Sequence, residues 1–400
     1  MIYFQYGARG VNLLEKFIND DLINGIIWDP RFSHKDLIEQ RKKIFTKKMS
    51  CLFDPKFFYY EYETPVLKNL EKLDFNPTEK ITRKYLNDQS KMSKYFDGLI
   101  QYQLQIDTEN IMAPSLRIES FDSVNSERQL NLLDNFNDFI SQKNIEKNKC
   151  INLTIDEGAF NNTDKMNDFI SSLDELREYF SDIYLTIIRN QESNNKLSFN
   201  QKCLENILNF IYFLNYIGYK VTVGYTGLEG ILYFAVGATN IGTNISQSLK
   251  RLVIDKIGLT GKINDQGGSQ AKSHYTSIPL LNYLKCDLFL DQIRESDREK
   301  LFQLILSDSQ LDNEIKTGKK SFEYTLIDTQ YQYMEALHKF ISSLENRSLK
   351  DRIDYVINSI NLAIEKTNEY NELFQIANLP ANHLTEWKNA LTSFKEKNIY

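Results

Sequence analysis

Four acidic side chains follow short apolar runs in this chain, at positions where they could act as catalytic groups on a bound ligand. Carboxylates that share one cavity supply the nucleophile, acid or base of many hydrolases and transferases. The four that we predict to be catalytic are Asp29, Asp54, Asp156 and Glu157. A structural use stays open for each of them, because an Asp before Pro is a common turn residue and adjacent acids can cap the next helix.

Arginines and other polar residues follow the same kind of run. Arg117 and Arg189 could bind a carboxylate, a phosphate or a base edge, or they could simply neutralise the nearby acids. His34 could serve as a general base or proton carrier. The predicted substrate-binding residues are Tyr6, His34, Arg117, Arg189, Tyr225, Asn240, Gly242 and Asn244, with Arg31, Glu119 and Asn190 expected nearby.

Two glycine-rich stretches form the most specific motif. They read GYTGLEG (residues 224–230) and GATNIGTNIS (237–246). Each places small residues between a predicted strand and a predicted helix, where free backbone amides can bind phosphate or another anion. The same glycines would also suit tight strand–helix turns that bind nothing.

The elements that must position these residues are eight apolar runs separated by helix-like segments. Strands that alternate with helices indicate an α/β protein, and eight of them indicate a (β/α)₈ TIM-type barrel. In such barrels the chemistry lies at the carboxyl ends of the strands, where the residues named above are found. The predicted strands lie in residues 2–7, 25–31, 51–57, 110–117, 151–158, 183–190, 220–227 and 238–244.

The chain has 400 residues, about 150 more than a minimal barrel needs. We place the barrel in residues 1–250, with a helical insertion after strand three at 56–109 and a helical extension at 251–400. The insertion begins with an aromatic run and could be a lid, a docking arm or a plain decoration. Helices are predicted at 246–255 and, in the extension, at 296–307, 328–345, 349–372 and 383–396.

Composition narrows the functional class. The formal net charge of −6 argues against a protein that binds nucleic acid mainly through its backbone, although a local basic patch could still do so. No nucleotide-binding fingerprint is present, and the four cysteines lie too far apart for a zinc site, so we expect no cofactor and no metal. The run at 2–7 leaves no room for a signal peptide and no run could span a bilayer, so we expect a cytoplasmic protein without membrane contact.

The segment from 223 to 252, VGYTGLEGILYFAVGATNIGTNISQSLKRL, resembles the last two strands of tRNA-guanine transglycosylase-like barrels of phage and mobile-element context. The resemblance implies a carboxylate that attacks a sugar carbon and a second that orients the base. It assigns no roles among Asp29, Asp54 and Asp156. The chain lacks the cysteine-rich zinc site of the tRNA-modifying members.

Two functions remain in competition. The first is an enzyme, a transglycosylase- or glycosidase-like transferase or hydrolase, that acts on a nucleobase, nucleotide or other phosphate-bearing anionic ligand. A glycoside-type variant of it would use the pair Glu119 and Glu229. The second is a binding or scaffold component of a prokaryotic antiviral-defence or mobile-element system, with a protein partner bound through residues 57–105 or the C-terminal helices.

Overall fold

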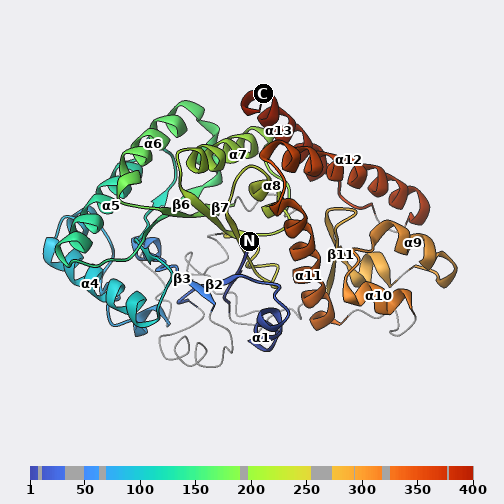
Figure 1. Ribbon diagram of the computed structural model, residues 1–400, viewed down its shortest axis with the longest axis horizontal. Helices are drawn as coiled ribbons and strands as arrows, with labels where there is room; N and C mark the ends of the chain where they lie inside the picture. Colours follow the sequence, from blue (N-terminus) through green and yellow to red (C-terminus); the bar gives the residue numbers. More distant parts are fainter. Residues whose placement is uncertain are drawn as a thin grey trace. The chain divides into compact units, whose positions relative to one another are not determined.

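The computed structural model describes residues 1–7, 11–31, 49–62, 69–189, 197–253, 273–291, 293–317, 325–375 and 378–399 (Figure 1). The chain forms two compact units. Unit 1 comprises Met1–Glu192, Phe210–Thr226 and Gly237–Ile263, and unit 2 comprises Ser193–Asn209, Gly227–Val236 and Asn264–Tyr400. Every predicted site residue except the pair partner Glu229 belongs to unit 1.

Unit 1 contains the predicted barrel. Its strands run in the order β3-β2-β1-β9-β8-β7-β6-β4, and every neighbouring pair is parallel. Between the outer strands, the Glu109 amide donates to the Cys51 carbonyl at 2.7 Å. The short strand β5 (Arg117–Ile118) pairs with β6 beyond β4. The eight path strands are β1 (Ile2–Gln5), β2 (Gly25–Trp28), β3 (Ser50–Phe53), β4 (Ile111–Met112), β6 (Lys149–Asp156), β7 (Asp182–Ile188), β8 (Lys220–Thr226) and β9 (Asn240–Thr243).

Helices alternate with these strands and cover the outside of the sheet, as Figure 1 shows for α4, α5 and α6 beside β6. Several begin where a side chain satisfies a free backbone amide, for example at Asp88, Ser123 and Asn162. The helices are α1 (Val11–Asn19), α3 (Arg83–Leu86), α4 (Gln89–Gln105), α5 (Val124–Gln142), α6 (Thr163–Glu175) and α7 (Gln201–Tyr216), with one-turn segments η1 (Phe57–Glu61), η2 (Leu70–Lys72), η3 (Glu157–Asn161) and η4 (Leu176–Glu178). The alternation confirms the (β/α)₈ prediction.

The barrel interior changes from apolar to polar along the strands. One buried layer is the cluster Tyr3, Ile27, Leu52, Met112, Cys150 and Tyr184. Side chains two residues apart in a strand point to the same side, so the next inward layer holds polar groups. They are Gln5, Asp29, Asp54, Asn152 and Thr186, and all are buried. A barrel filled only for stability would continue with branched apolar residues there.

Unit 2 is mainly helical, and its own apolar core includes Tyr275, Leu284, Leu301 and Tyr370. The four predicted helices of the extension are confirmed. The antiparallel hairpin of β10 (His274–Ser277) and β11 (Asn282–Lys285) was not predicted within the helical extension. Its helices are α8 (Gly230–Ala235), α9 (Arg298–Ile305), α10 (Gln310–Lys316), α11 (Leu326–Glu345), α12 (Leu349–Phe374) and α13 (Asn382–Asn398), with short turns η6 (Cys286–Leu290) and η7 (Glu295–Asp297).

One predicted helix of unit 1 is wrong as far as it is described. Residues 246–253 form bends and an extended bridge in which Arg189 donates its backbone N–H to the Leu252 carbonyl at 2.8 Å. The side chain of Asn244 accepts from the Ser246 amide at 2.6 Å. This local side-chain turn competes with the start of a helix.

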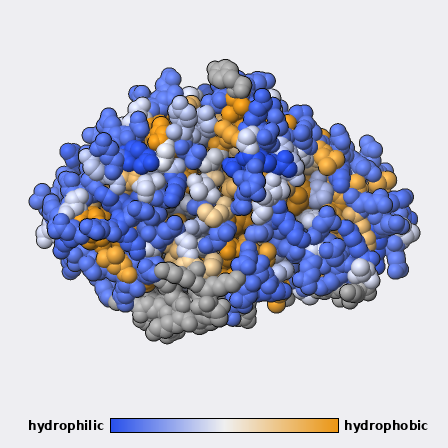
Figure 2. Space-filling model, in the orientation of Figure 1, coloured by the Kyte–Doolittle hydropathy of each residue, from blue (hydrophilic) through white to orange (hydrophobic). Residues whose placement is uncertain are grey.

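The surface is largely hydrophilic on the face drawn in Figure 2, with scattered apolar patches. Within the described residues, no helix is both long and apolar enough to cross a membrane. All four cysteines are buried free thiols.

Candidate functional site

The ends of β2 and β3 place two acids beside two cations. Asp29 follows β2, and Arg31 donates from Nε to its Oδ1 at 3.0 Å and from Nη2 to its Oδ2 at 2.5 Å. Asp54 follows β3, and Lys56 Nζ lies 2.5 Å from its Oδ2. All four residues are buried. We call Asp29, Arg31, Asp54, Lys56 and Tyr225 the inner cluster.

Tyr225, near the end of β8, joins the two pairs. Its hydroxyl donates to Asp29 Oδ2 at 2.6 Å and accepts from Arg31 Nη2 at 2.8 Å. Lys56 Nζ lies 4.3 Å from the centre of its ring. Tyr225 and Lys56 both have left-handed backbone, with φ of 55° and 53°, which is unfavourable for residues with side chains. Strained residues of this kind concentrate at functional sites.

Electrostatics within the inner cluster follow from burial and pairing. Burial opposes the charge of Asp29, but Arg31 and Lys56 outweigh it and hold the pKa of the carboxyl below its ordinary value. For Lys56 burial wins over the attraction of Asp54, so the pKa of its amine is lowered. The formal charges of two acids and two cations cancel, so the cluster is complete without an added ion.

A second group of polar residues lies where β5 and β6 end. Arg117 donates from Nε to Asp156 Oδ1 at 2.8 Å and from Nη2 to Oδ2 at 2.5 Å, a bidentate pair. Arg117 Nη1 donates to the Tyr62 hydroxyl at 2.8 Å and lies 3.3 Å from Glu119. The side chains of Arg117 and Asp156 are 22% and 20% exposed, unlike those of the inner cluster. We call Glu61, Tyr62, Arg117, Glu119 and Asp156 the rim cluster.

Glu61 is the acid of the rim cluster whose two oxygens accept hydrogen bonds from a backbone amide and from an asparagine side chain. Its Oε2 accepts from the Arg117 backbone amide at 2.8 Å, and its Oε1 accepts from Asn125 Nδ2 at 2.8 Å. Burial raises the pKa of its carboxyl to about 7, although both hydrogen bonds and the charge of Arg117 act in the opposite direction. A carboxyl with a pKa near neutrality can both give and take a proton at physiological pH.

The remaining predicted residues that the structure describes do not join either cluster. Glu157 pairs with Arg189 at 3.0 Å in a separate buried contact. Tyr6 packs its ring 4.9 Å from that of Trp28. Asn240 stands at the start of β9 and donates to Thr222 Oγ1, while Asn244 donates to the Gln5 carbonyl. Two further predicted residues, His34 and Asn190, lie outside the described residues. The ligand-binding roles of all of them stay predictions.

The glycine-rich stretches serve packing in this structure. A Cβ on Gly224 would lie 2.2 Å from the Tyr184 hydroxyl, and one on Gly242 would lie 3.2 Å from the Cα of Gly224. In unit 2 the Gly227 amide donates to Glu229 Oε1 at 2.9 Å, so a carboxylate already takes this amide. Gly224 and Gly242 lie inside β8 and β9, where they permit close packing and form no strand–helix turn. None of these contacts supports the anion site.

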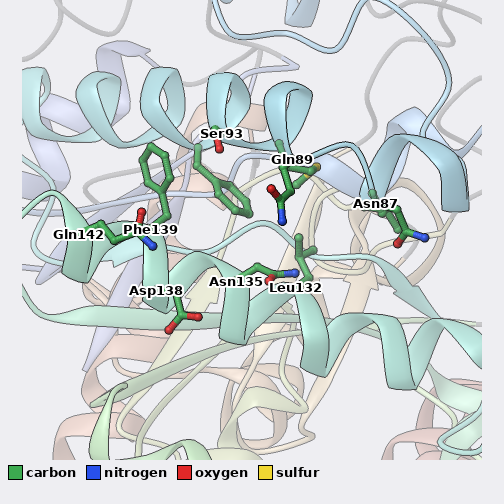
Figure 3. Close-up of a pocket in the computed structure, with 11 residues that line it drawn as sticks. Asn87, Gln89, Ser93, Leu132, Asn135, Asp138, Phe139 and Gln142 are labelled. Carbon is green, nitrogen blue, oxygen red and sulfur yellow. The ribbon is translucent and has the colours of Figure 1, made fainter.

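Two other kinds of site, a metal site and a pocket, could lie away from the strand ends. Among the described residues, no group of three or more His, Cys, Asp or Glu side chains could hold a metal ion. A pocket of about 480 Å³ lies between α4 and α5. Figure 3 shows Gln89 and Ser93 on one helix and Asn135 and Asp138 on the other. None of the predicted site residues lines this pocket.

Sequence reasoning missed Lys56, Glu61 and Asn152. Lys56 and Glu61 flank the aromatic run of the predicted insertion, and Asn152 lies inside a predicted strand that is otherwise mostly apolar. Two of these residues could have been found from their chemistry, because a polar side chain in an apolar segment needs a partner. A Lys two residues after a strand-end Asp, and an Asn in an otherwise apolar strand, both need a buried partner.

Comparisons with known proteins add little to this geometry. No protein-family model and no curated protein matches the sequence. Five solved chains match in structure. One is a point mutant of an O-GlcNAc hydrolase from Thermobaculum terrenum, 11% identical, with a TM-score of 0.32 over 100% of this chain and 94% of the other. At this TM-score the likeness carries no argument, and the barrel assignment rests on the strand order.

Proposed function

We propose that this chain is an enzyme that cleaves or transfers a glycosidic bond by acid–base catalysis at the carboxyl ends of the barrel strands. The observation that carries the proposal is the rim cluster. There two carboxyl groups, Glu61 and Asp156, are held by one residue, Arg117, and remain partly open to solvent. Glycosidic hydrolysis uses two carboxyl groups in different roles, one as acid and one as nucleophile or base.

The environments of the two groups suggest how the roles divide. The pKa of Glu61 is raised to about 7 by burial, so a substantial fraction carries a proton at neutral pH. Glu61 would protonate the leaving group. Asp156, with both oxygens fixed by Arg117, would face the sugar carbon as nucleophile or as the base that activates water. The substrates to test first are nucleotides, a class predicted from the sequence, and simple glycosides.

The experiment is a release assay with nucleotides and with aryl glycosides of graded leaving-group acidity. We expect wild-type activity that falls as the pH rises through about 7, because Glu61 then loses its proton. Glu61→Gln should lower the rate about 100-fold or more for poor leaving groups. The loss should be much smaller for nitrophenolate, which leaves without a proton. Glu79→Gln, an exposed acid paired with Lys91, is the matched control.

A scaffold function is the second candidate, because the side chains of the inner cluster are buried and paired with one another. Purified protein that is folded, releases no product across the panel and co-purifies with a stoichiometric protein partner would support the scaffold and contradict the enzyme. Equal leaving-group dependence in wild type and Glu61→Gln would contradict the acid role of Glu61.

A further inference from the structure

Lys56 is a buried amine that the rim chemistry does not use. Its side chain is 0% exposed, with Nζ 2.5 Å from Asp54 Oδ2. The rings of Tyr225 and Phe58 lie 4.3 Å and 5.9 Å from Nζ. A second cation, Arg31, is near enough to disfavour the charge of Lys56. Desolvation and a neighbouring cation are the two devices that make a lysine nucleophilic.

The buried layer that contains Asp54 also contains an acceptor and a donor atom without hydrogen-bond partners among the described residues. Asn152 donates from Nδ2 to Asp54 Oδ1 at 3.4 Å, and its Oδ1 has no partner among the described residues. Gln5 accepts at Oε1 from the Tyr184 hydroxyl at 3.0 Å, and its Nε2 likewise has no partner in the described part of the chain. Asn152 and Tyr184 are register neighbours on β6 and β7. An orphan acceptor and an orphan donor in one buried layer are costly, and a bound polar molecule would satisfy them.

The Lys56–Asp54 pair can release a free amine without creating net charge. If the ammonium proton moves to Asp54, an ion pair becomes a neutral amine and a neutral acid. Burial penalises the ion pair more than the neutral pair. The amine is then nucleophilic, and the proton that it gave up remains on the adjacent carboxyl.

We propose that Lys56 forms an imine with a small aldehyde or ketone. The amine nitrogen adds to the carbonyl carbon, and the carbonyl oxygen becomes the hydroxyl of a carbinolamine. Asp54 gives its proton to that hydroxyl, which leaves as water while the C=N⁺ bond forms. The products are a protonated imine, the Asp54 carboxylate and one water, and nothing is oxidised or reduced. Gln5 Nε2 and Asn152 Oδ1 are the groups available to hold the polar part of the carbonyl compound.

The test uses the full chain in its native state at pH 6.5 with glycolaldehyde as the probe and cyanoborohydride to reduce any imine. Labelled lysines are then mapped by mass spectrometry of peptides. Lys202 and Lys220 are exposed and serve as the reference lysines. Solvated lysine amines are almost entirely protonated at this pH and therefore react slowly. We expect Lys56 to be labelled about tenfold faster than these two, or faster still.

Two controls make the outcome decisive. Unfolding in urea should bring the labelling rate of Lys56 down to that of Lys202, and Asp54→Asn in folded protein should slow Lys56 alone. Native Lys56 that stays unlabelled, or that reacts no faster than Lys202, overturns the proposal. Lys56 labelling that is unchanged in Asp54→Asn overturns the role of Asp54. None of these readouts depends on the proposed glycosidic activity or on Glu61.

Discussion

The inner and rim clusters contain the same types of charged residue but differ in charge balance and in exposure to solvent. In the inner cluster two acids face two cations, every charge is paired and all five side chains are buried. In the rim cluster the acids Glu61, Glu119 and Asp156 share one cation, Arg117, and solvent reaches most of them. The formal charges of the inner cluster thus balance away from water, while the rim cluster has an excess of acids near water.

The consequence of imbalance is visible in the pKa values. The inner carboxyl Asp29 has a lowered pKa because two cations outweigh its burial. Glu61 has only part of one guanidinium to offset its burial, so its pKa rises to about 7. The same desolvation thus yields a permanent anion in one place and a titrating acid in the other.

The largest effect should come from breaking an inner pair. Asp29→Ala leaves the buried Arg31 without its carboxylate and should cost about 3–5 kcal/mol of unfolding free energy, the usual result for a buried pair that loses one partner. Chemical denaturation monitored by fluorescence measures it. The double variant Asp29→Leu with Arg31→Met removes both charges and should recover most of the loss. A loss below about 1 kcal/mol for Asp29→Ala would mean that the pair is not sealed from water.

The next effect concerns the pH dependence of stability at the rim. The folded pKa of Glu61, about 7, lies above its ordinary value of 4.5, so the folded state binds the proton more tightly. Its contribution is therefore fully present below pH 4.5 and is lost as the pH rises through 7. Glu61→Gln, which mimics the protonated form, should remove this loss, worth on the order of 3 kcal/mol between about pH 4.5 and 8. Chemical denaturation at a series of pH values measures this. The same pH dependence of the unfolding free energy in wild type and variant would contradict the raised pKa.

The barrel could be predicted from the sequence because its signal is local and repeated. Each strand is a short apolar run that ends at a polar or Gly- or Pro-containing turn, and these features depend little on the rest of the chain. The hairpin at His274–Ser277 and Asn282–Lys285 was missed because four-residue strands carry little periodicity. The expected helix at 246–255 failed because the Asn244 side chain forms a local turn that propensity does not reveal.

The sequence indicates which polar side chains follow a strand, but not which of them pair with one another. Acids and arginines at the strand ends can be located from the apolar runs before them, yet which arginine meets which acid depends on where β5, β6 and η1 lie in three dimensions. Glu61 illustrates the limit. Nothing in FFYYE indicates that its carboxyl meets the amide of Arg117, 56 residues later in the sequence. Its raised pKa is a product of that tertiary contact.

A smaller effect on stability should come from replacing glycine by alanine, and its size should differ between the packed barrel interior and the strand ends. A Cβ at Gly224 would lie 2.2 Å from the Tyr184 hydroxyl, which is fixed by Gln5. Gly224→Ala should therefore cost about 1–3 kcal/mol through overpacking. At Gly158, in η3 just after Asp156, an added Cβ meets nothing within 4 Å. Gly158→Ala should leave stability within about 0.5 kcal/mol of wild type. Equal losses from the two variants, measured by thermal unfolding, would contradict this contrast.

The smallest effect should come from Glu119, the outermost acid of the rim cluster. Its side chain is 64% exposed and lies 3.3 Å from Arg117 Nη1. Exposed pairs of this kind contribute roughly 0–1 kcal/mol, because solvent screens the charges and both side chains lose freedom. Glu119→Gln should therefore change stability little, and that change should vanish at high salt. A double-mutant cycle with Arg117→Gln measures the coupling. Coupling well above about 1 kcal/mol would show that the rim is as sealed as the inner cluster, and the division of labour between the two clusters would then fail.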